Sequence, residues 1–158
     1  MSTELLPFFA YGTLLPGQPN AHLWADHVTA WQPATLADCA LYDLGHFPMC
    51  VPAPGGIVHG QLAEVDAAKY QQVQRHLDEL EGYNPADPDN SPYQRLARVV
   101  TLAAGTEQTA WVYIGQQIYI ANRPLIASGD WLTYRAENLL AAQNWWQKNR
   151  ADYFNKRN

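Results

Sequence analysis

Residues 6–20 read LPFFAYGTLLPGQPN, an apolar and aromatic run followed by a stretch punctuated by glycine and proline. The apolar run predicts a short buried strand over Leu6–Tyr11, which Gly12 closes. The glycines and prolines that follow predict a structured loop over Gly12–Asn20. Because Gly12 permits a close backbone approach or a positive φ, successive N–H groups of the loop can converge on an anion without a cationic side chain. An ordinary strand-to-loop turn explains the same pattern.

Charge is distributed unevenly along this chain of 158 residues, whose net charge is −5. Residues 1–68 contain six acids and no Lys or Arg, whereas residues 69–158 carry all ten bases. A protein that binds a nucleic-acid backbone needs a basic stripe, so nucleic-acid binding is not expected. An anionic ligand at the Gly12–Asn20 loop must therefore be held mainly by main-chain donors.

The N-terminus and the cysteines predict a cytoplasmic location. No positive charge precedes the first apolar run, and Pro7 and Gly12 interrupt it, so a signal peptide is not expected. Proline, glycine and polar residues break each long uncharged stretch, so no membrane span is expected. Cys39 and Cys50 are expected to be reduced thiols packed in the core.

Strand patterns dominate the first two-thirds of the chain and predict an α+β protein around a mixed, barrel-like sheet. The predicted strands are one or two over Val28–Leu44, two over Pro48–Val51 and Ile57–Val65 with a turn at Gly55–Gly56, and a hairpin of Tyr93–Ala103 and Thr109–Gly115. The predicted helical segments are a brief turn at Ala21–Trp24, a helix over Ala67–Leu80 capped by Asp66, and a long helix from about Asp130 to Phe154 capped by Ser128.

The long C-terminal helix is predicted to be amphipathic. Leu132, Leu139, Trp146 and Tyr153 recur every seven residues along it. Such a stripe packs either on the domain or on a partner. If the partner is a second copy of the chain, the helix forms a homodimer. The Trp145–Trp146 pair and the basic tail beyond it suggest packing or self-association.

Common catalytic motifs are absent from the sequence. None of the three serines lies in a GxSxG motif, and there is no HExxH, Walker A, GxGxxG or EF-hand pattern. The five histidines show no metal-ligand spacing, so a metal site is not expected. Most hydrolase and cofactor chemistries therefore lack support.

The stretch LDELEGY at residues 77–83 ends the predicted helix over Ala67–Leu80. On a helix, Glu81 lies at about 20° from Tyr70, on the apolar face, and Glu79 lies at about 180°. Partial burial and the helix dipole both raise a carboxyl pKa toward neutrality, as a general base and acid requires. A frayed helix end with a solvated Glu81 is the alternative.

Taken in this order, the Tyr11-Gly12-Thr13-Leu14 loop and the Glu81-Gly82 helix end resemble the gamma-glutamylcyclotransferase-like family, and most closely its gamma-glutamylamine cyclotransferase branch with bacterial relatives. The resemblance extends over about residues 6–135. It implies a small mixed β-barrel with flanking helices, as one domain over residues 1–158 with a helical extension at about 130–155. It also implies that Glu81 is catalytic, that Tyr11, Gly12, Thr13 and Leu14 bind substrate, and that no cofactor is needed.

The activity that this resemblance implies is cleavage of a small γ-glutamyl amide by its own α-amine, which releases 5-oxoproline and an amine or amino acid. Two alternatives stay open: removal of a γ-glutamyl protecting group from a biosynthetic intermediate, and a non-catalytic ligand-binding or interaction module on the same scaffold. Arg95 and Arg98 either contact an anionic substrate or are solvated strand residues. Tyr113 could line the site from its strand, although Trp111 on the same face could equally belong to the core, so Tyr113 is not assigned to the site.

Overall fold

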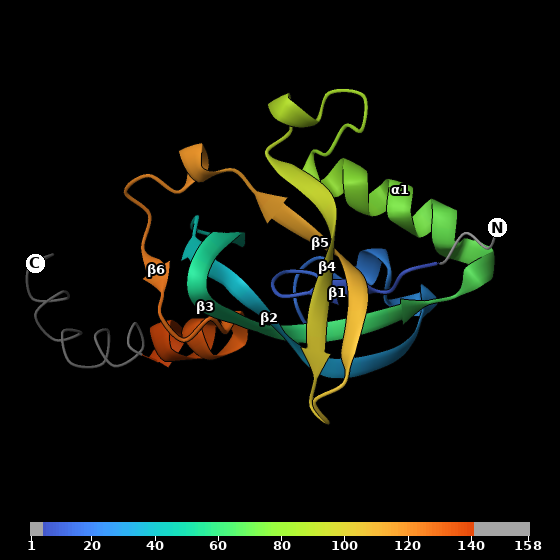
Figure 1. The fold of residues 1–158 in the computed structure, drawn as a ribbon, viewed down its shortest axis with the longest axis horizontal. Coiled ribbons are helices and arrows are strands. Elements are labelled where there is room, and N and C mark those ends of the chain that lie inside the picture. The colour runs from blue at the N-terminus through green and yellow to red at the C-terminus, as the bar shows by residue number, and fades with distance from the viewer. Residues whose placement is uncertain (1–4, 141–158) are drawn as a thin grey trace, which may run out of the picture.

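The computed structural model describes residues 5–140, and its strands close into a barrel (Figure 1). Hydrogen bonding joins five strands in the order β3-β1-β5-β4-β2, and pairing of β2 with β3 closes the ring. The pair β1–β5 is parallel and the others are antiparallel, so the barrel is mixed. The expected α+β class with a small mixed barrel is confirmed. The strands are β1 (Phe8–Ala10), β2 (Val28–Asp43), β3 (Pro48–Val65), β4 (Tyr93–Leu102), β5 (Glu107–Gly115) and β6 (Leu125–Ile126), which pairs with β2.

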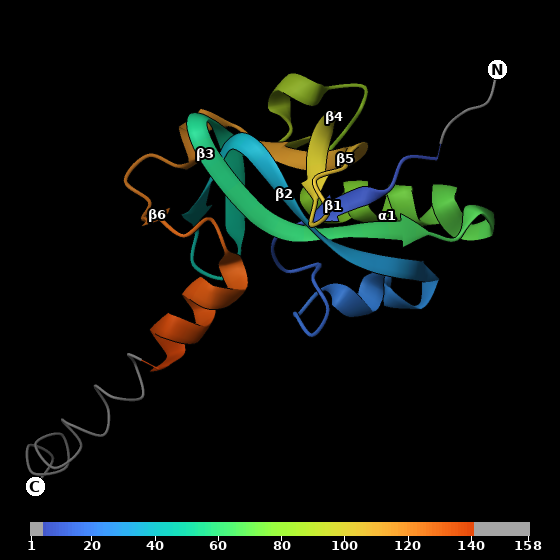
Figure 2. The same cartoon turned by 60° about the horizontal axis from the view of Figure 1, so that its bottom comes forward.

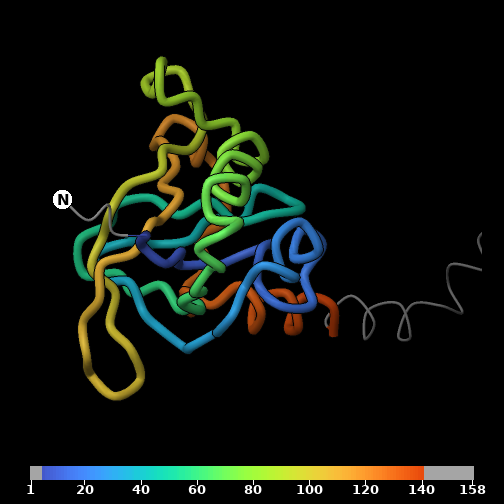
Figure 3. The backbone as a smooth tube through the Cα atoms, turned by 90° about the vertical axis from the view of Figure 1, so that its right-hand side faces the viewer, coloured from blue at the N-terminus to red at the C-terminus, as the bar shows by residue number. Residues whose placement is uncertain are grey.

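Helical segments flank the barrel on different sides (Figure 2). Among residues 5–140, none is long and apolar enough to cross a membrane. The hairpin of β4 and β5 extends away from α1, as the tube view shows (Figure 3). The helical segments are η1 (Ala21–Leu23), η2 (Ala25–His27), η3 (Ala67–Lys69), α1 (Tyr70–Glu81), η4 (Pro88–Asn90), η5 (Gln117–Tyr119) and a C-terminal helix described over residues 131–140.

The strands β2 and β3 are longer than the sequence suggests. The expected turn at Gly55–Gly56 is wrong, because β3 runs without interruption through these residues. Opposite Gly55, the strand β2 has a register shift at Asp38, whose φ is 58°. The Asp38 carboxylate accepts a hydrogen bond from the Gly55 N–H at 3.0 Å, which stabilises the irregularity. The two glycines therefore accommodate a bulge within one bent strand pair.

Alternation along β1 divides the apolar residues into two layers. Phe9 packs inside the barrel, whereas Phe8 and Ala10 pack on its outer face beneath α1. Cys39 and Cys50 are buried in the interior layer as free thiols, as expected. The outer layer continues into the cavity described below.

The helix α1 forms where the sequence predicts it. Asp66 accepts a hydrogen bond from the Ala68 N–H at 3.1 Å and caps the preceding 3-10 turn. The apolar face of α1 is buried, and it includes Tyr70, Val73 and Leu77. The helix ends directly after Glu81 in a Schellman motif formed around Gly82, described in the next section.

The C-terminal helix differs from the prediction in its cap and in its contacts. Asp130, not Ser128, caps it, because the Asp130 carboxylate accepts from the N–H groups of Leu132 and Thr133. The buried residue that anchors it to the barrel is Trp131. Leu132 and Leu139 are 41% and 62% exposed, so the predicted stripe does not face the barrel there. Its other members, Trp146 and Tyr153, lie outside the described residues.

Candidate active site

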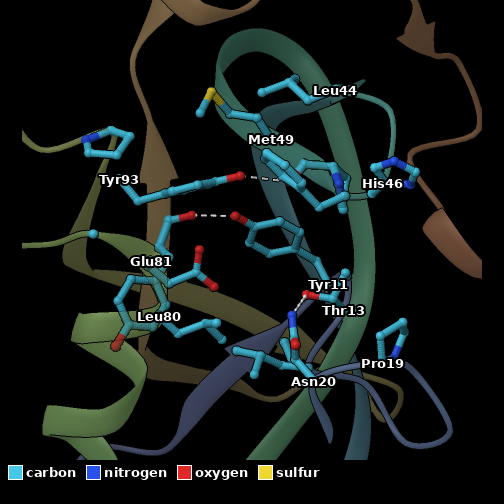
Figure 4. A pocket seen from close by; sticks show the side chains of 18 of the residues that line it. Tyr11, Thr13, Pro19, Asn20, Leu44, His46, Met49, Leu80, Glu81 and Tyr93 are labelled. Atoms are coloured by element: carbon cyan, nitrogen blue, oxygen red, sulfur yellow. Dashed lines mark hydrogen bonds between the residues drawn. The ribbon is translucent and has the colours of Figure 1, made fainter.

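A cavity of about 510 Å³ opens beside the end of α1. Several parts of the chain enclose it: β1 and the loop after it, the β2–β3 connection with the start of β3, the end of α1, the start of β4, and β5 with η5. Figure 4 shows Glu81 on one side of it and Leu44, His46 and Pro19 on the other. The volume lies within the range of about 300–1,000 Å³ that is usual for small-molecule sites.

Glu81 reaches this cavity from the last residue of α1. Gly82 has a φ of 70°, and its N–H donates to the Glu79 carbonyl at 3.2 Å. The Tyr83 N–H donates to the Asp78 carbonyl at 2.8 Å, which completes the motif. A residue with left-handed φ favours glycine, so the Glu-Gly pair stops the helix where its final side chain faces the cavity.

The environment of Glu81 is that of an acid–base group. The side chain is half-buried, and burial raises its pKa to about 7. Glu79 is exposed on the opposite side of the helix, as the helical wheel predicts. The alternative of a frayed, solvated helix end is wrong, because Glu81 is helical and faces the cavity.

Tyr11 and Gly12 bring the loop after β1 to the cavity. The Tyr11 hydroxyl donates to the main-chain carbonyl of Tyr113, and burial raises the Tyr11 pKa well above its usual value. A Cβ on Gly12 would lie 2.6 Å from Cγ of Pro48, so the loop approaches the start of β3 too closely for any side chain. The sequence offered two reasons for a glycine at this position, a close backbone approach and a positive φ. The close approach is the one that applies, since Gly12 has no positive φ.

The rest of the loop is closed by polar contacts. Asn20 donates from its N–H to the Thr13 carbonyl and from its side chain to the Thr13 hydroxyl, both at 2.9 Å. The Trp24 indole N–H donates to the Leu14 carbonyl at 3.0 Å. Within residues 5–140, the N–H groups of Gly12, Thr13 and Leu14 donate to no protein acceptor. The loop is therefore rigid and still has main-chain donors to offer.

The cavity has an unusual charge balance. Its described lining contains one acid, Glu81, one histidine, His46, and neither Lys nor Arg. Arg95 lies elsewhere: its Nε donates to Asp78 at 2.9 Å, and its guanidinium lies 4.4 Å from the centre of the Trp111 ring. Arg98 is exposed and donates to the Ala97 carbonyl. The suggestion that Arg95 contributes to anion binding in this cavity is not supported by its position.

Comparison with known proteins gives the family. A family model described as "Gamma-glutamyl cyclotransferase, AIG2-like" matches residues 8–133. The chain belongs to this family. It is 32% identical over 124 residues to the gamma-glutamylcyclotransferase family protein YtfP of Escherichia coli K12, covering 78% of this chain and 94% of that protein. The Citrobacter rodentium protein of the same name is 31% identical over 124 residues, covering 78% and 93%.

Solved structures show the same family fold. A crystal structure of an AIG2-like protein from Mus musculus has a TM-score of 0.57 and 28% identity, covering 76% of this chain and 84% of that one. YkqA from Bacillus subtilis, at 23% identity and a TM-score of 0.63, shows the fold alone, covering 84% of this chain and 42% of that one. The cavity described above is thus formed on a gamma-glutamyl cyclotransferase fold.

Sequence reasoning missed Tyr93 and Phe47, which line the cavity, and Asp78, which does not line it and is 9% exposed. Asp78 accepts from the Tyr113 hydroxyl at 2.7 Å and from Arg95. Because the Tyr113 carbonyl accepts from Tyr11, this contact links α1 and β5 to the loop after β1. Tyr113 also lines the cavity, as the sequence suggested, while Trp111 packs against a core cluster. The only signal was the position of Asp78 at about 80° on the helical wheel, at the margin of the apolar face.

Proposed function

We propose that this chain is an enzyme that cleaves a γ-glutamyl amide by intramolecular attack of the α-amine, releasing 5-oxoproline and the displaced amine or amino acid. The observation that supports it best is the half-buried Glu81 carboxylate, with a pKa of about 7, beside a loop with unused main-chain donors. A pKa near the operating pH suits a group that must accept a proton and then return it.

In the proposed reaction, Glu81 accepts a proton from the α-ammonium of the substrate. The free amine attacks the γ-carbonyl carbon, and a five-membered ring forms through a tetrahedral oxyanion. The bond from that carbon to the leaving nitrogen then breaks, and Glu81 returns the proton to this nitrogen. The ring nitrogen gives up its second proton in the same collapse, so the products are the neutral lactam of 5-oxoproline and a released amine that takes up this proton as an ammonium. The attacking group is part of the substrate, so folding it into the reactive conformer provides much of the acceleration.

The loop residues Tyr11, Gly12, Thr13 and Leu14 are proposed to bind the substrate. Main-chain N–H groups of Gly12–Leu14 would hold its α-carboxylate or the oxyanion, because the described lining offers no Lys or Arg for this purpose. The contact of Gly12 with Pro48 and the bonds from Asn20 to Thr13 keep these donors in place before substrate arrives.

The test is incubation of the protein with a panel of γ-glutamyl amines and γ-glutamyl amino acids, with 5-oxoproline as the readout. We expect release by the wild type and by Glu79→Gln, whose side chain is exposed outside the cavity, but not by folded Glu81→Gln. Silence of the folded wild type across the panel would instead favour the non-catalytic module. If Glu81→Gln and Glu79→Gln turned over substrate equally, Glu81 would have no part in the mechanism.

Two further expectations remain proposals independent of the reaction. A homodimer through the C-terminal helix predicts a dimeric mass in sedimentation that is lost when the chain ends at residue 140. A cytoplasmic location predicts recovery in the soluble fraction of the cells that make it.

A further inference from the structure

The lining of the cavity changes character from its interior to its mouth. Tyr11, Tyr93 and Tyr113 are buried, and they surround the region that the Glu81 carboxylate faces. The lining also contains large apolar side chains that remain open to solvent: Phe47 and Tyr119 are 40% exposed and Leu80 is 39% exposed. These three come from the β2–β3 connection, η5 and α1.

The three exposed side chains share one feature that scattered surface residues lack. Segments far apart in the sequence bring them to the rim of a single cavity, so one ligand can cover all three. Burying such apolar surface favours a ligand that is itself apolar. Leu44, which is half-buried, and Met49, which is buried, continue the same apolar lining.

Charge restricts the ligand further. In a γ-glutamyl amino acid, the α-carboxylate of the leaving group is two bonds from the scissile nitrogen, so it must lie close to Glu81. The described lining offers no Lys or Arg to pair with it, and two carboxylates in one desolvated site repel each other. A distal ammonium, as in a diamine, would lie at the apolar mouth, where the described lining provides no acid.

We infer that the leaving group of this enzyme is a neutral, apolar amine, of the arylalkylamine or branched alkylamine class, and that Phe47, Leu80 and Tyr119 bind its hydrocarbon part. The inference rests on the proposed function, since it assigns the part of the substrate that leaves. The glutamyl part lies inside with Glu81 and the Gly12–Leu14 loop, and the amine substituent extends through the mouth.

The first experiment compares three substrates that share the γ-glutamyl group: γ-glutamyl-phenethylamide, γ-glutamyl-phenylalanine and γ-glutamyl-putrescine. The first two differ only in the α-carboxylate, so their ratio isolates the charge. We expect kcat/KM for the phenethylamide to exceed that of each of the others by about tenfold or more, since a tenfold ratio needs only one unpaired charge. Equal or reversed preference would overturn the inference.

Variants at the mouth test the assigned residues. Phe47→Ala and Tyr119→Ala should raise KM for the phenethylamide by about three- to tenfold through lost apolar contact, with little change in kcat. The control is Ile118→Ala, because Ile118 is 72% exposed beside Tyr119 and does not line the cavity. For γ-glutamyl-methylamide, which is too short to reach the mouth, Phe47→Ala and Tyr119→Ala should change KM far less than they do for the phenethylamide, and Ile118→Ala should match the wild type with both substrates.

A charge introduced at the mouth gives the sharpest readout. Phe47→Arg should shift the ratio of the phenethylamide to the phenylalanine substrate toward the latter by about fivefold or more, because the guanidinium pairs with the added carboxylate. An unchanged ratio would contradict the placement of the leaving group. A failure of the proposed function would give a different result. In that case no substrate, not even the methylamide, would show a release of 5-oxoproline that Glu81→Gln abolishes.

Discussion

Asp78 and Glu81 lie one helical turn apart on neighbouring positions of α1, and their surroundings differ sharply. Asp78 accepts from Arg95 and from the Tyr113 hydroxyl. Glu81 faces a cavity whose described lining contains neither Lys nor Arg, and burial raises its pKa to about 7. The first carboxylate has a guanidinium partner, whereas the second is desolvated without a charged partner in the described lining.

The difference shows that two neighbouring carboxylates at one helix end can have unlike surroundings. A carboxylate paired with a guanidinium holds neighbouring elements together, and removing one partner leaves the other charge uncompensated. A desolvated carboxylate without a partner destabilises the fold in its charged form, and a group perturbed in this way is a candidate for acid–base chemistry. Variants of the two residues should therefore separate activity from stability.

The largest expected effect is on catalysis by Glu81→Gln. Losing the proton acceptor should lower kcat by about 10²- to 10⁴-fold, the usual contribution of a general acid–base group. Asp78→Asn should lose far less activity per folded molecule, since Asp78 does not line the cavity. Steady-state release of 5-oxoproline, corrected for the folded fraction, measures both. A larger loss in the Asp78 variant would reverse the assignment of roles.

Asp78→Ala should have the largest effect on stability. It leaves Arg95, whose side chain is 13% exposed, without its carboxylate, so the free energy of unfolding should fall by about 2–4 kcal/mol. Urea unfolding measures the change, with Glu79→Ala as the exposed control. Adding Arg95→Leu to Asp78→Ala should restore part of the loss. If the variant with both substitutions were less stable than Asp78→Ala alone, the loss in Asp78→Ala would not come from an unpaired Arg95.

Raising the pH through the pKa of Glu81 should increase activity and decrease the stability of the wild type. The pKa of Glu81 is raised from 4.5 to about 7, so the fold favours the protonated form. Below pH 4.5, the wild type and Glu81→Gln should have the same free energy of unfolding. As the pH rises through 7, the free energy of unfolding of the variant should come to exceed that of the wild type by about 1–3 kcal/mol. Wild-type kcat/KM should instead rise toward an inflection near pH 7. Chemical denaturation and pH–rate profiles test the two; parallel trends would contradict the desolvated carboxylate.

Tyr113→Phe should produce a moderate effect on both properties. It removes the hydroxyl that donates to Asp78, which costs about 1 kcal/mol of unfolding free energy. The main-chain carbonyl that accepts from Tyr11 remains, so the substrate loop should keep its position and kcat should fall by less than about tenfold. A collapse of activity with unchanged stability would give the Tyr113 hydroxyl a role in the reaction itself.

The smallest expected effect is that of salt on KM. Main-chain donors hold the substrate anion in the proposed site, and the nearby Arg95 is already paired, so KM should change by less than about twofold between about 0.05 and 0.5 M NaCl. Initial rates across this range measure it. A steep rise of KM would indicate that a cationic side chain reaches the substrate.

Local sequence features predicted much of the fold and the centre of the site. The expected strand over Leu6–Tyr11 and helix over Ala67–Leu80 differ from β1 and from η3 with α1 by no more than two residues at either end. The helical wheel also separated Glu81 from Glu79. These features depend on apolar periodicity and on glycine, which act over a few residues and can be read from the chain itself.

Contacts between distant segments could not be read in this way. The partner of Arg95 is Asp78, seventeen residues earlier, and nothing local distinguishes that pairing from a substrate contact. The continuity of β3 through Gly55 depends on a bulge of β3 that faces Asp38 of the opposite strand, whose carboxylate accepts from the Gly55 N–H. The mouth of the cavity, with Phe47, Leu80 and Tyr119, is formed by three separate elements.

The sequence by itself therefore determined which carboxylate ends the helix toward the apolar side, and which loop lacks any cationic help. Only the tertiary structure decided that Glu81 is desolvated enough for its pKa to reach about 7 while Asp78 is paired. The physical reason is that backbone geometry follows from neighbouring residues, whereas desolvation and charge pairing depend on which distant atoms come within a few ångströms.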